Sequence, residues 1–384
     1  MRIFYLSNHV GQLDFDLIVK NAQVKPNPAG QNFHGKLIEA FAKIGEVTCF
    51  SLVPTAEDCF EHKVGIKGNG IPHYYFYPPK RSFIPKAFTM PGKIIKSVLD
   101  HFKEIKPDET FVVYDTLNLA IARTAKMLSK KLGCRRIAVC TDDPFNITGA
   151  SDFYISSVLR YSKDADAYFC LTKGLEELFN VTMKPYLIRM GIVESVGDMH
   201  QFEEKPYIYY GGALFYKDGT DALLQAYQEA KPNCKLIISG HGPSSAKVIE
   251  AAKDNPNIVF LGQISKQDNY SYEAHASLCI NPRLYRGYLD KVSVPSKVME
   301  YLRLCPYVAS TLSTPIKEIY PEAINWIESD PEIAPKQLAE FFKAHMDENG
   351  NLIGLKENTA RETILSEYGV EGLAKQLNDF ISSL

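Results

Sequence analysis

The sequence predicts an α/β protein made of two doubly wound, Rossmann-like domains with an interdomain cleft. Two observations carry this prediction. Short apolar runs alternate with segments of helical period along the chain, and the alternation restarts near residue 207. Strands that alternate with helices form parallel sheets with helices on both faces. A length of 384 residues suffices for two domains of ordinary size.

The first half contains five apolar runs of strand length. They are residues 3–7, 47–52, 110–114, 137–141 and 167–171. After Gly30, apolar residues recur at helical spacing, and a further helix is predicted between the third strand and residue 132. This half is predicted to form a domain of residues 1–190.

The second half repeats the alternation with strands at 207–210, 235–239, 258–261, 278–280 and 307–309. Helices are predicted between these strands, and a last helix is predicted near 370–381. We expect a second domain of residues 191–365, while residues 366–384 pack back on the first domain. Ligands bind at the carboxyl ends of parallel strands, so glycines and polar residues at those ends are the candidate site.

Composition excludes several classes of protein. The net charge is −2, so no global basic field suggests nucleic-acid binding. No HExxH, GxSxG or Walker A motif occurs, which leaves no anchor for a metallopeptidase, a serine hydrolase or a P-loop enzyme. No segment has the ~18 apolar residues of a membrane span. The first residues do not resemble a signal peptide, so we expect a cytoplasmic protein.

The segment from Arg283 to Glu300 is the most informative one. Pro295 and Ser296 are predicted to open a helix, with Ser296 as a candidate N-cap. The amino end of a helix suits a diphosphate, and Lys297 and Arg283 add positive charge there. Glu300, one turn along, can accept hydrogen bonds from two vicinal hydroxyls of a ribose. The alternative is an ordinary capped helix with an acidic residue in its first turn.

The segments together resemble family-4 (group 1) glycosyltransferases of the GT-B fold, and most of all the bacterial capsule and exopolysaccharide members. The resemblance is carried by INPR at 280–283, PSKVMEY at 295–301, YGGALFYKDG at 210–219, ISGHGP at 238–243 and FLG at 260–262. Their order and spacing extend over about residues 207–310. The combination is specific to the family, whereas each piece alone is weak.

The resemblance implies a nucleotide-sugar donor site in the second domain. Glu300 would bind the ribose, and Gly211 and Gly212 would approach the diphosphate. Relatives often carry an arginine in the turn at residues 211–213, and this chain has none there, so Lys217, Lys297 and Arg283 are the candidates for neutralising the diphosphate. The residues implied around the base and diphosphate are Gly240, Gly242, Gly262, Ile264, Arg283, Ser296 and Lys297. Many relatives carry a further Glu that would fall at Val292 here, and Asp290 is the candidate substitute.

Two places in the first half are candidates for the acceptor side. Gly30 and Asn32 lie in a segment that, in the family, forms a glycine-containing loop near the donor phosphates and the acceptor; the alternative is a simple helix-start turn. Asp142 and Asp143 follow a predicted strand and could orient an acceptor hydroxyl or accept its proton. The alternative for them is an Asp-Pro turn that caps the next helix. Asp115 has a similar position after its strand.

Residues 74–96 interleave aromatic with basic side chains, which suits peripheral contact with a lipid headgroup surface. The alternative is that these aromatic side chains belong to the ordinary core.

The resemblance implies a retaining, metal-independent hexosyl transfer from a nucleotide-diphosphate sugar to a glycan or lipid-diphosphate acceptor in surface polysaccharide biosynthesis. Two rival functions stay open: a nucleotide-sugar epimerase of the same fold, and a non-catalytic partner subunit.

Overall fold

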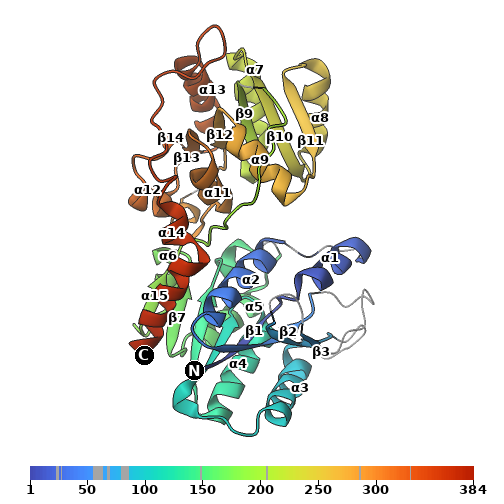
Figure 1. Ribbon diagram of the computed structural model, residues 1–384, viewed down its shortest axis with the longest axis vertical. Coiled ribbons are helices and arrows are strands. Elements are labelled where there is room, and N and C mark those ends of the chain that lie inside the picture. The colour runs from blue at the N-terminus through green and yellow to red at the C-terminus, as the bar shows by residue number, and fades with distance from the viewer. Residues whose placement is uncertain are drawn as a thin grey trace. The chain divides into compact units, whose positions relative to one another are not determined.

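The computed structural model describes residues 1–22, 26, 28–54, 64–66, 70–78, 86–147, 149–204, 206–284, 287–328 and 330–384. The chain forms two compact units. Unit 1 consists of Met1–Ile192 with Val370–Leu384, and unit 2 consists of Val193–Gly369. Each unit is a Rossmann-like α/β layer structure, which confirms the predicted fold class (Figure 1).

Unit 1 is built on an eight-stranded sheet of order β3-β4-β2-β1-β5-β6-β7-β8. Its strands are β1 Arg2–Ser7, β2 Glu46–Leu52, β3 Val64–Ile66, β4 Pro72–Phe76, β5 Thr110–Asp115, β6 Arg135–Cys140, β7 Ala167–Cys170 and β8 Tyr186–Ile188. All neighbouring pairs are parallel except β3 with β4. The chain order reverses direction between β1 and β5, so the carboxyl ends of these two strands form a topological switch point.

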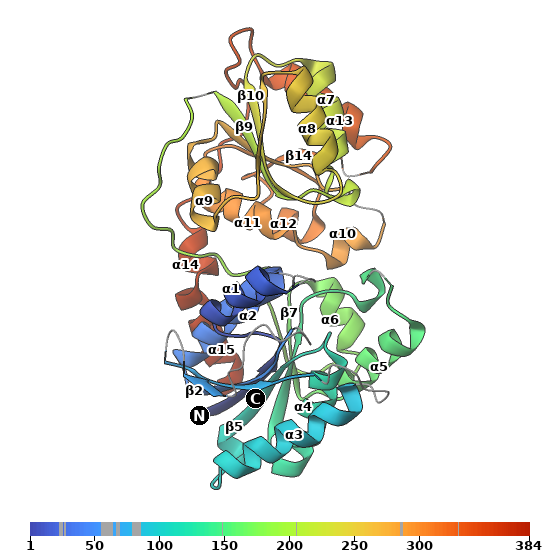
Figure 2. The same cartoon turned by 90° about the vertical axis from the view of Figure 1, so that its right-hand side faces the viewer.

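The α-helices of unit 1 are α1 Gln12–Asn21, α2 Pro28–Ala42, α3 Lys86–His101, α4 Leu119–Leu132, α5 Asp152–Ser162, α6 Lys173–Phe179 and α15 Val370–Ser382. Helices α3 and α4 pack side by side (Figure 2). The last helix, α15, packs on α2 and buries Leu373, Leu377 and Phe380 in the same core as Ile3 of β1. The two ends of the chain therefore lie in one unit.

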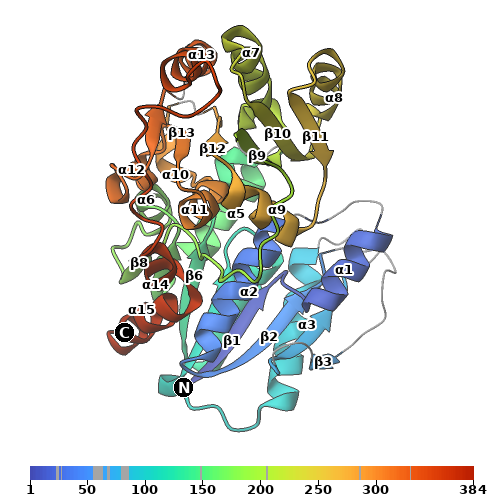
Figure 3. The ribbon, with the colours of Figure 1, turned by 45° about the horizontal axis from the view of Figure 1, so that its top comes forward.

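Unit 2 is built on a six-stranded, all-parallel sheet of order β11-β10-β9-β12-β13-β14. Its strands are β9 Tyr207–Ala213, β10 Lys235–His241, β11 Ile258–Gly262, β12 Leu278–Asn281, β13 Val308–Thr311 and β14 Asn325–Ile327. Figure 3 shows β13, β12, β9, β10 and β11 in this spatial order. The chain order reverses between β9 and β12, which places the switch point of unit 2 at their carboxyl ends.

The α-helices of unit 2 are α7 Thr220–Ala230, α8 Ser245–Asp254, α9 Lys266–His275, α10 Leu289–Val292, α11 Ser296–Leu304, α12 Thr314–Ile319, α13 Ala334–His345 and α14 Ile364–Tyr368. Helix α13 packs against α7, and α9 packs against α11. The pair α9 and α11 carries Asn269, Glu273, Lys297, Glu300 and Tyr301, which are discussed below.

One predicted loop is a helix in the structure. Gly30 and Asn32 are exposed residues of the first turns of α2, which already begins at Pro28. Proline fixes φ near the helical value and lacks only an amide that the first turn leaves unpaired anyway, so Pro28 starts the helix before the glycine. A Cβ added to Gly30 would meet open space, so no contact within the described part of the chain requires glycine there.

Substituting Leu377 by alanine is expected to destabilise unit 1 by about 2–5 kcal/mol, because a fully buried leucine is removed from its core. The single tryptophan, Trp326, lies on β14 of unit 2 and reports that unit separately. Urea unfolding followed by circular dichroism should show the loss, while the Trp326 fluorescence transition should keep its midpoint. Lys375→Ala, on the exposed face of α15, is the control. A fluorescence midpoint that shifts alone would contradict the assignment of α15 to unit 1.

Candidate functional site

The connections that follow β9 and β12 pack directly on each other. The Leu284 amide donates to the Lys217 carbonyl at 2.9 Å. Gly219 has φ +79, and a Cβ built there would lie 1.8 Å from the Pro282 oxygen. Only glycine tolerates both this conformation and this approach. The structure therefore brings the predicted residues Lys217 and Arg283 to neighbouring loops at the switch point.

An acidic residue lies between these two cations. The Arg283 Nε is 3.9 Å from Oδ1 of Asp218, which belongs to the 3-10 turn Tyr216–Asp218. Burial raises the pKa of the Asp218 carboxyl, and the charges of Arg283 and Lys217 offset part of that rise. Lys217 itself is exposed. The loops thus offer one exposed and one half-buried cation to an anion.

Helix α11 begins at the same end of the sheet. Its N-cap lies one residue earlier than the predicted N-cap, Ser296. Pro295 is the N-cap, with φ −73 and ψ 101, and Ser296 is the first helical residue. No side chain caps the helix, so the N-cap role predicted for Ser296 is wrong. A proline can occupy the N-cap because that residue is extended and its amide lies outside the helix. The amino end still carries the partial positive charge of nine aligned residues.

A tyrosine hydroxyl fixes α11 to β9. The Gly211 amide donates to the Tyr301 hydroxyl at 3.0 Å, and that hydroxyl donates to the Gly211 carbonyl at 3.2 Å. Tyr301 is fully buried. The amide of Gly211, predicted to face a donor diphosphate, is therefore engaged within the protein. Contact of Gly212 with a donor diphosphate stays a prediction.

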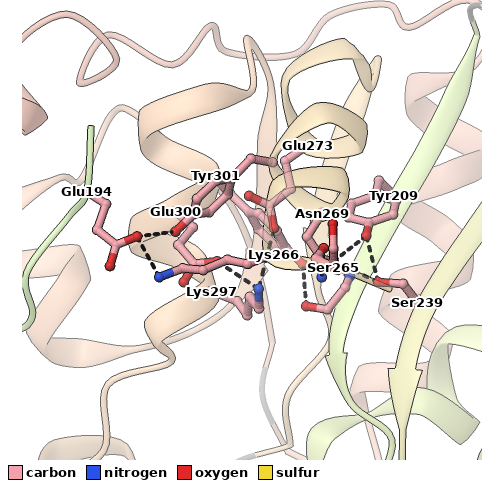
Figure 4. A network of polar contacts seen from close by, with 12 residues as sticks. Glu194, Tyr209, Ser239, Ser265, Lys266, Asn269, Glu273, Lys297, Glu300 and Tyr301 are labelled. Carbon is pink, nitrogen blue, oxygen red and sulfur yellow. Dashed lines mark hydrogen bonds and ion pairs between the residues drawn. The ribbon is translucent and has the colours of Figure 1, made fainter. Parts of the chain in front are cut away.

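Tyr209, Ser239 and the half-buried Asn269 form a polar cluster (Figure 4). Gly211 lies against this cluster. The Tyr209 hydroxyl is 2.6 Å from Ser239 Oγ and donates to Asn269 Oδ1 at 2.5 Å. A Cβ built on Gly211 would lie 2.8 Å from Asn269 Oδ1 and 2.9 Å from the Tyr209 ring. The glycine is thus required by packing, with or without a ligand.

Gly240, near the end of β10, and Gly242, just after it, are required by packing in the same way. A Cβ on Gly240, whose φ is +133, would lie 1.8 Å from the Gly212 carbonyl oxygen, and one on Gly242 would lie 2.3 Å from the Leu214 oxygen. Gly262 ends β11 with φ +66 and has open space around it. Ile264 is half-buried and directly precedes Ser265, whose side chain caps α9. These residues surround the ends of β10 and β11, where the base was predicted.

Three ionisable side chains meet between α9 and α11 (Figure 4). The Lys297 Nζ lies 2.7 Å from Glu300 Oε2 and 3.5 Å from Glu273 Oε1. Burial alone would lower the pKa of Lys297, but Glu300 and Glu273 outweigh it and raise that pKa. Burial raises the pKa of Glu273 to about 8, with Lys297 opposing and Glu300 reinforcing the rise. Glu273 carries no sequence motif, which is why the prediction missed it.

The candidate substitute for the missing family Glu is engaged elsewhere. Asp290 accepts a hydrogen bond from the Thr314 amide at 2.9 Å, and its other oxygen accepts one from the Thr314 hydroxyl. It thereby ties α10 to the start of α12. Val292, at the position of that Glu, is 1% exposed and belongs to the core. These contacts do not favour Asp290 as a sugar-binding carboxylate.

The aspartates predicted on the acceptor side follow β6 in unit 1. Asp143 is buried and accepts from the Phe145 amide at 2.8 Å, so it caps the 3-10 turn Pro144–Asn146. Burial raises the pKa of the Asp143 carboxyl, and Asp142 adds to the rise. Asp142 is half-buried and accepts from the Asp143 amide at 2.8 Å. The turn-capping alternative therefore describes Asp143, while Asp142 is the more accessible carboxylate.

A second polar cluster lies at the switch point of unit 1. The Tyr5 hydroxyl is 2.6 Å from His34 Nδ1, and His34 Nε2 is 4.0 Å from Asp115 Oδ2. Burial lowers the pKa of His34, and Asp115 opposes this. The ring of His9, which follows β1, lies tilted against that of His73, with ring centroids 5.4 Å apart. A histidine within the apolar stripe of α2 was the available sequence signal for His34.

Aromatic residues of the predicted lipid-contact segment contribute to the interior. Tyr75 is 5% exposed and donates to Asp14 Oδ2 at 2.8 Å, while Tyr74 stacks on Phe50 at 5.2 Å. Lys93 and the neighbouring Lys96 are exposed on α3. Residues 79–85 of this segment lie outside the described residues. Within the described part of the chain, no helix has the length and apolar character needed to cross a membrane.

The described residues also hold no group of three or more His, Cys, Asp or Glu side chains arranged to hold a metal ion.

The predicted donor residues share one edge of the sheet in unit 2. They lie at or after the carboxyl ends of β9, β10 and β12, and they are Gly211, Gly212, Gly240, Gly242, Lys217, Arg283, Ser296, Lys297 and Glu300. The predicted acceptor-side residues lie in unit 1. The arrangement in unit 2 can hold an anion beside a carboxylate.

Comparison with protein families finds one match. Residues 205–344, which lie within unit 2, match the sequence model of the family described as glycosyl transferases group 1. This stretch includes the candidate donor residues. A search of curated proteins found no significant match.

Solved structures of similar fold cover the entire chain. Sucrose-phosphate synthase from Thermosynechococcus elongatus has a TM-score of 0.70 and 12% identity, and the alignment covers 100% of this chain and 99% of that one. HepE from Anabaena in complex with UDP has a TM-score of 0.67, 12% identity and full coverage of both chains. An E. coli structure described as trehalose-6-phosphate bound with UDP-2-fluoro glucose has a TM-score of 0.67, 10% identity and coverage of 100% and 99%. These likenesses confirm the GT-B fold class.

Replacing Tyr301 by phenylalanine is expected to cost about 1–3 kcal/mol in the stability of unit 2, because the buried Gly211 amide loses its partner. Urea unfolding followed by Trp326 fluorescence measures this cost. Tyr216→Phe is the matched control, since that residue is 60% exposed. Equal stability of the two variants would show that the Tyr301 hydroxyl does not hold α11 on β9.

Proposed function

We propose that the protein is a retaining glycosyltransferase that moves a hexose-type residue from a nucleotide-diphosphate sugar to a glycan or lipid-linked acceptor in surface polysaccharide biosynthesis. The observation that carries the proposal is the junction in unit 2. There the amino end of α11, Lys217, Arg283 and Glu300 belong to segments that surround one switch point. The match of residues 205–344 to group 1 glycosyltransferases supports it.

The donor is proposed to bind in unit 2. Its diphosphate would lie against the first amides of α11 and the cations Lys217 and Arg283, because aligned peptide dipoles and guanidinium or ammonium groups favour phosphate oxygens. Glu300, whose side chain is 22% exposed, would accept hydrogen bonds from the ribose hydroxyls. HepE, of similar fold, has been solved in complexes with UDP and with UDP-glucose, which supports a nucleotide-sugar donor.

The proposed reaction breaks the bond between the anomeric carbon and the diphosphate oxygen and forms a bond from that carbon to an acceptor oxygen. Negative charge grows on the leaving diphosphate, so preorganised amides and cations lower the barrier. The acceptor proton passes to a leaving phosphate oxygen, and this balances the transfer without a dedicated base. We propose that no metal ion is needed, since the chain supplies these positive groups itself.

The acceptor is proposed to bind unit 1. Asp142 follows β6 at the carboxyl edge of the sheet and is half-buried, so it is the carboxylate best placed to orient an acceptor hydroxyl. Asp143 acts on it indirectly, because its own carboxylate caps the adjoining turn and its amide holds Asp142. Peripheral contact with a lipid surface through residues 74–96 belongs to the same proposal.

Replacing Glu300 by alanine is expected to weaken UDP binding roughly tenfold or more, because two hydrogen bonds from hydroxyls to a carboxylate are lost. Isothermal titration calorimetry with UDP measures the effect. Glu250→Ala, on the exposed surface of α8, is the control. An unchanged dissociation constant in a folded Glu300→Ala protein would rule out the ribose contact.

A further inference from the structure

Glu273 has no evident structural use for its charge. It lies on α9, is fully buried, and neither carboxylate oxygen has a hydrogen-bond partner among the described residues. An isolated buried carboxylate costs several kcal/mol unless a cation or hydrogen bonds compensate it. A buried methionine or leucine would avoid this cost. Its presence beside the candidate donor residues therefore calls for a functional reason.

A single ammonium serves two carboxylates at this place. The Lys297 Nζ is 2.7 Å from Glu300 but 3.5 Å from Glu273, so Glu300 is its close partner and Glu273 its distant one. The three side chains are graded in exposure, with Glu273 at 0%, Glu300 at 22% and Lys297 at 29%. Glu300 and Lys297 can reach a ligand, whereas Glu273 cannot.

The position of Lys297 on its helix reinforces this interpretation. A cation in the first turn of α11 is disfavoured by the helix dipole, and the two carboxylates compensate for that. When Glu300 turns to a ligand, the ammonium loses its close partner. Glu273 is then the remaining carboxylate within 4 Å among the described residues.

We propose that Glu273 is a positioning residue for the donor site: it takes over the Lys297 ammonium when Glu300 moves from that ammonium to the hydroxyls of the donor ribose. The proposal rests on the proposed function. Glu273 touches no substrate in this account. It keeps Lys297 at the start of α11, beside the diphosphate, during the exchange of partners by Glu300.

The exchange has a consequence for protons. In the free protein Glu300 helps to raise the pKa of Glu273, whereas Lys297 lowers it. Departure of Glu300 and closer approach of Lys297 both lower that pKa, which starts at about 8. Because the pKa of Glu273 in the free protein is raised to about 8, this carboxyl carries a proton part of the time near that pH, and binding of the nucleotide should release part of that proton.

The neighbours of Glu273 do not obscure this release. The titratable groups that face it are Lys297, Glu300, Tyr301 and Cys305 from α11 and its end, Cys279 from β12, Tyr209 from β9 and Tyr270 from α9. Burial raises the pKa of Tyr209, Tyr270, Tyr301 and Cys279. These phenols and this thiol stay neutral near pH 7.5, and the raised pKa of Lys297 keeps it charged.

Calorimetry of UDP binding at pH 7.5 in two buffers of different ionisation enthalpy tests the proposal. Wild-type protein and the control Glu250→Gln should release a fraction of a proton, whereas Glu273→Gln should bind UDP without that release. Glu273→Gln keeps the size of the side chain, and circular dichroism verifies its fold. If it does not fold, Lys297→Met serves instead and should also show no linked release.

Each outcome decides one question. Release in wild type that persists in Glu273→Gln, or binding by wild type with no release or with proton uptake, overturns the role of Glu273 and leaves the proposed function standing. A wild-type protein that binds neither UDP nor any other nucleoside diphosphate overturns both. Release confined to proteins that retain Glu273 and Lys297 supports the proposal.

Discussion

The hydroxyl of Tyr301 sets the geometry on which the candidate donor site depends. By accepting from the Gly211 amide and donating to the Gly211 carbonyl, it fixes α11 against the end of β9. The amino end of α11 is thereby held at the switch point between β9 and β12, where an α/β sheet offers its ligand site. Lys297 and Glu300 take their positions from the same helix.

The glycines around the switch point of unit 2 allow neighbouring backbone segments to pack in direct contact. Gly219 accommodates the Pro282 carbonyl, Gly240 accommodates the Gly212 carbonyl, and Gly242 accommodates the Leu214 carbonyl. Each approach would be blocked by a Cβ, so the glycines are explained by the fold before any ligand is considered. The resulting loops are close together, and this concentrates Lys217 and Arg283 at one place. Packing alone therefore requires glycine at these positions.

Sequence patterns predict the structure well where the periodicity of apolar residues defines a strand or helix, and where a motif follows the end of a strand. The apolar runs located most strands of both sheets, and the order of the motifs placed Lys217, Arg283 and Lys297 around one switch point. Contacts that no local pattern records were missed. The start of α2 at Pro28 and the N-cap of α11 at Pro295 depend on the backbone conformation of one or two residues. Glu273, His34 and the Tyr301 hydroxyl acquire their roles from residues distant in the chain, so only the folded structure revealed them.

The central claim is that a nucleotide diphosphate lies against the amino end of α11. A crystal structure of the protein with UDP-glucose tests this most directly. The account predicts diphosphate oxygens within hydrogen-bond distance of the first amides of α11, near Arg283 and Lys217, with the ribose at Glu300. A nucleotide bound elsewhere, or protein side chains filling that place in the complex, would contradict it.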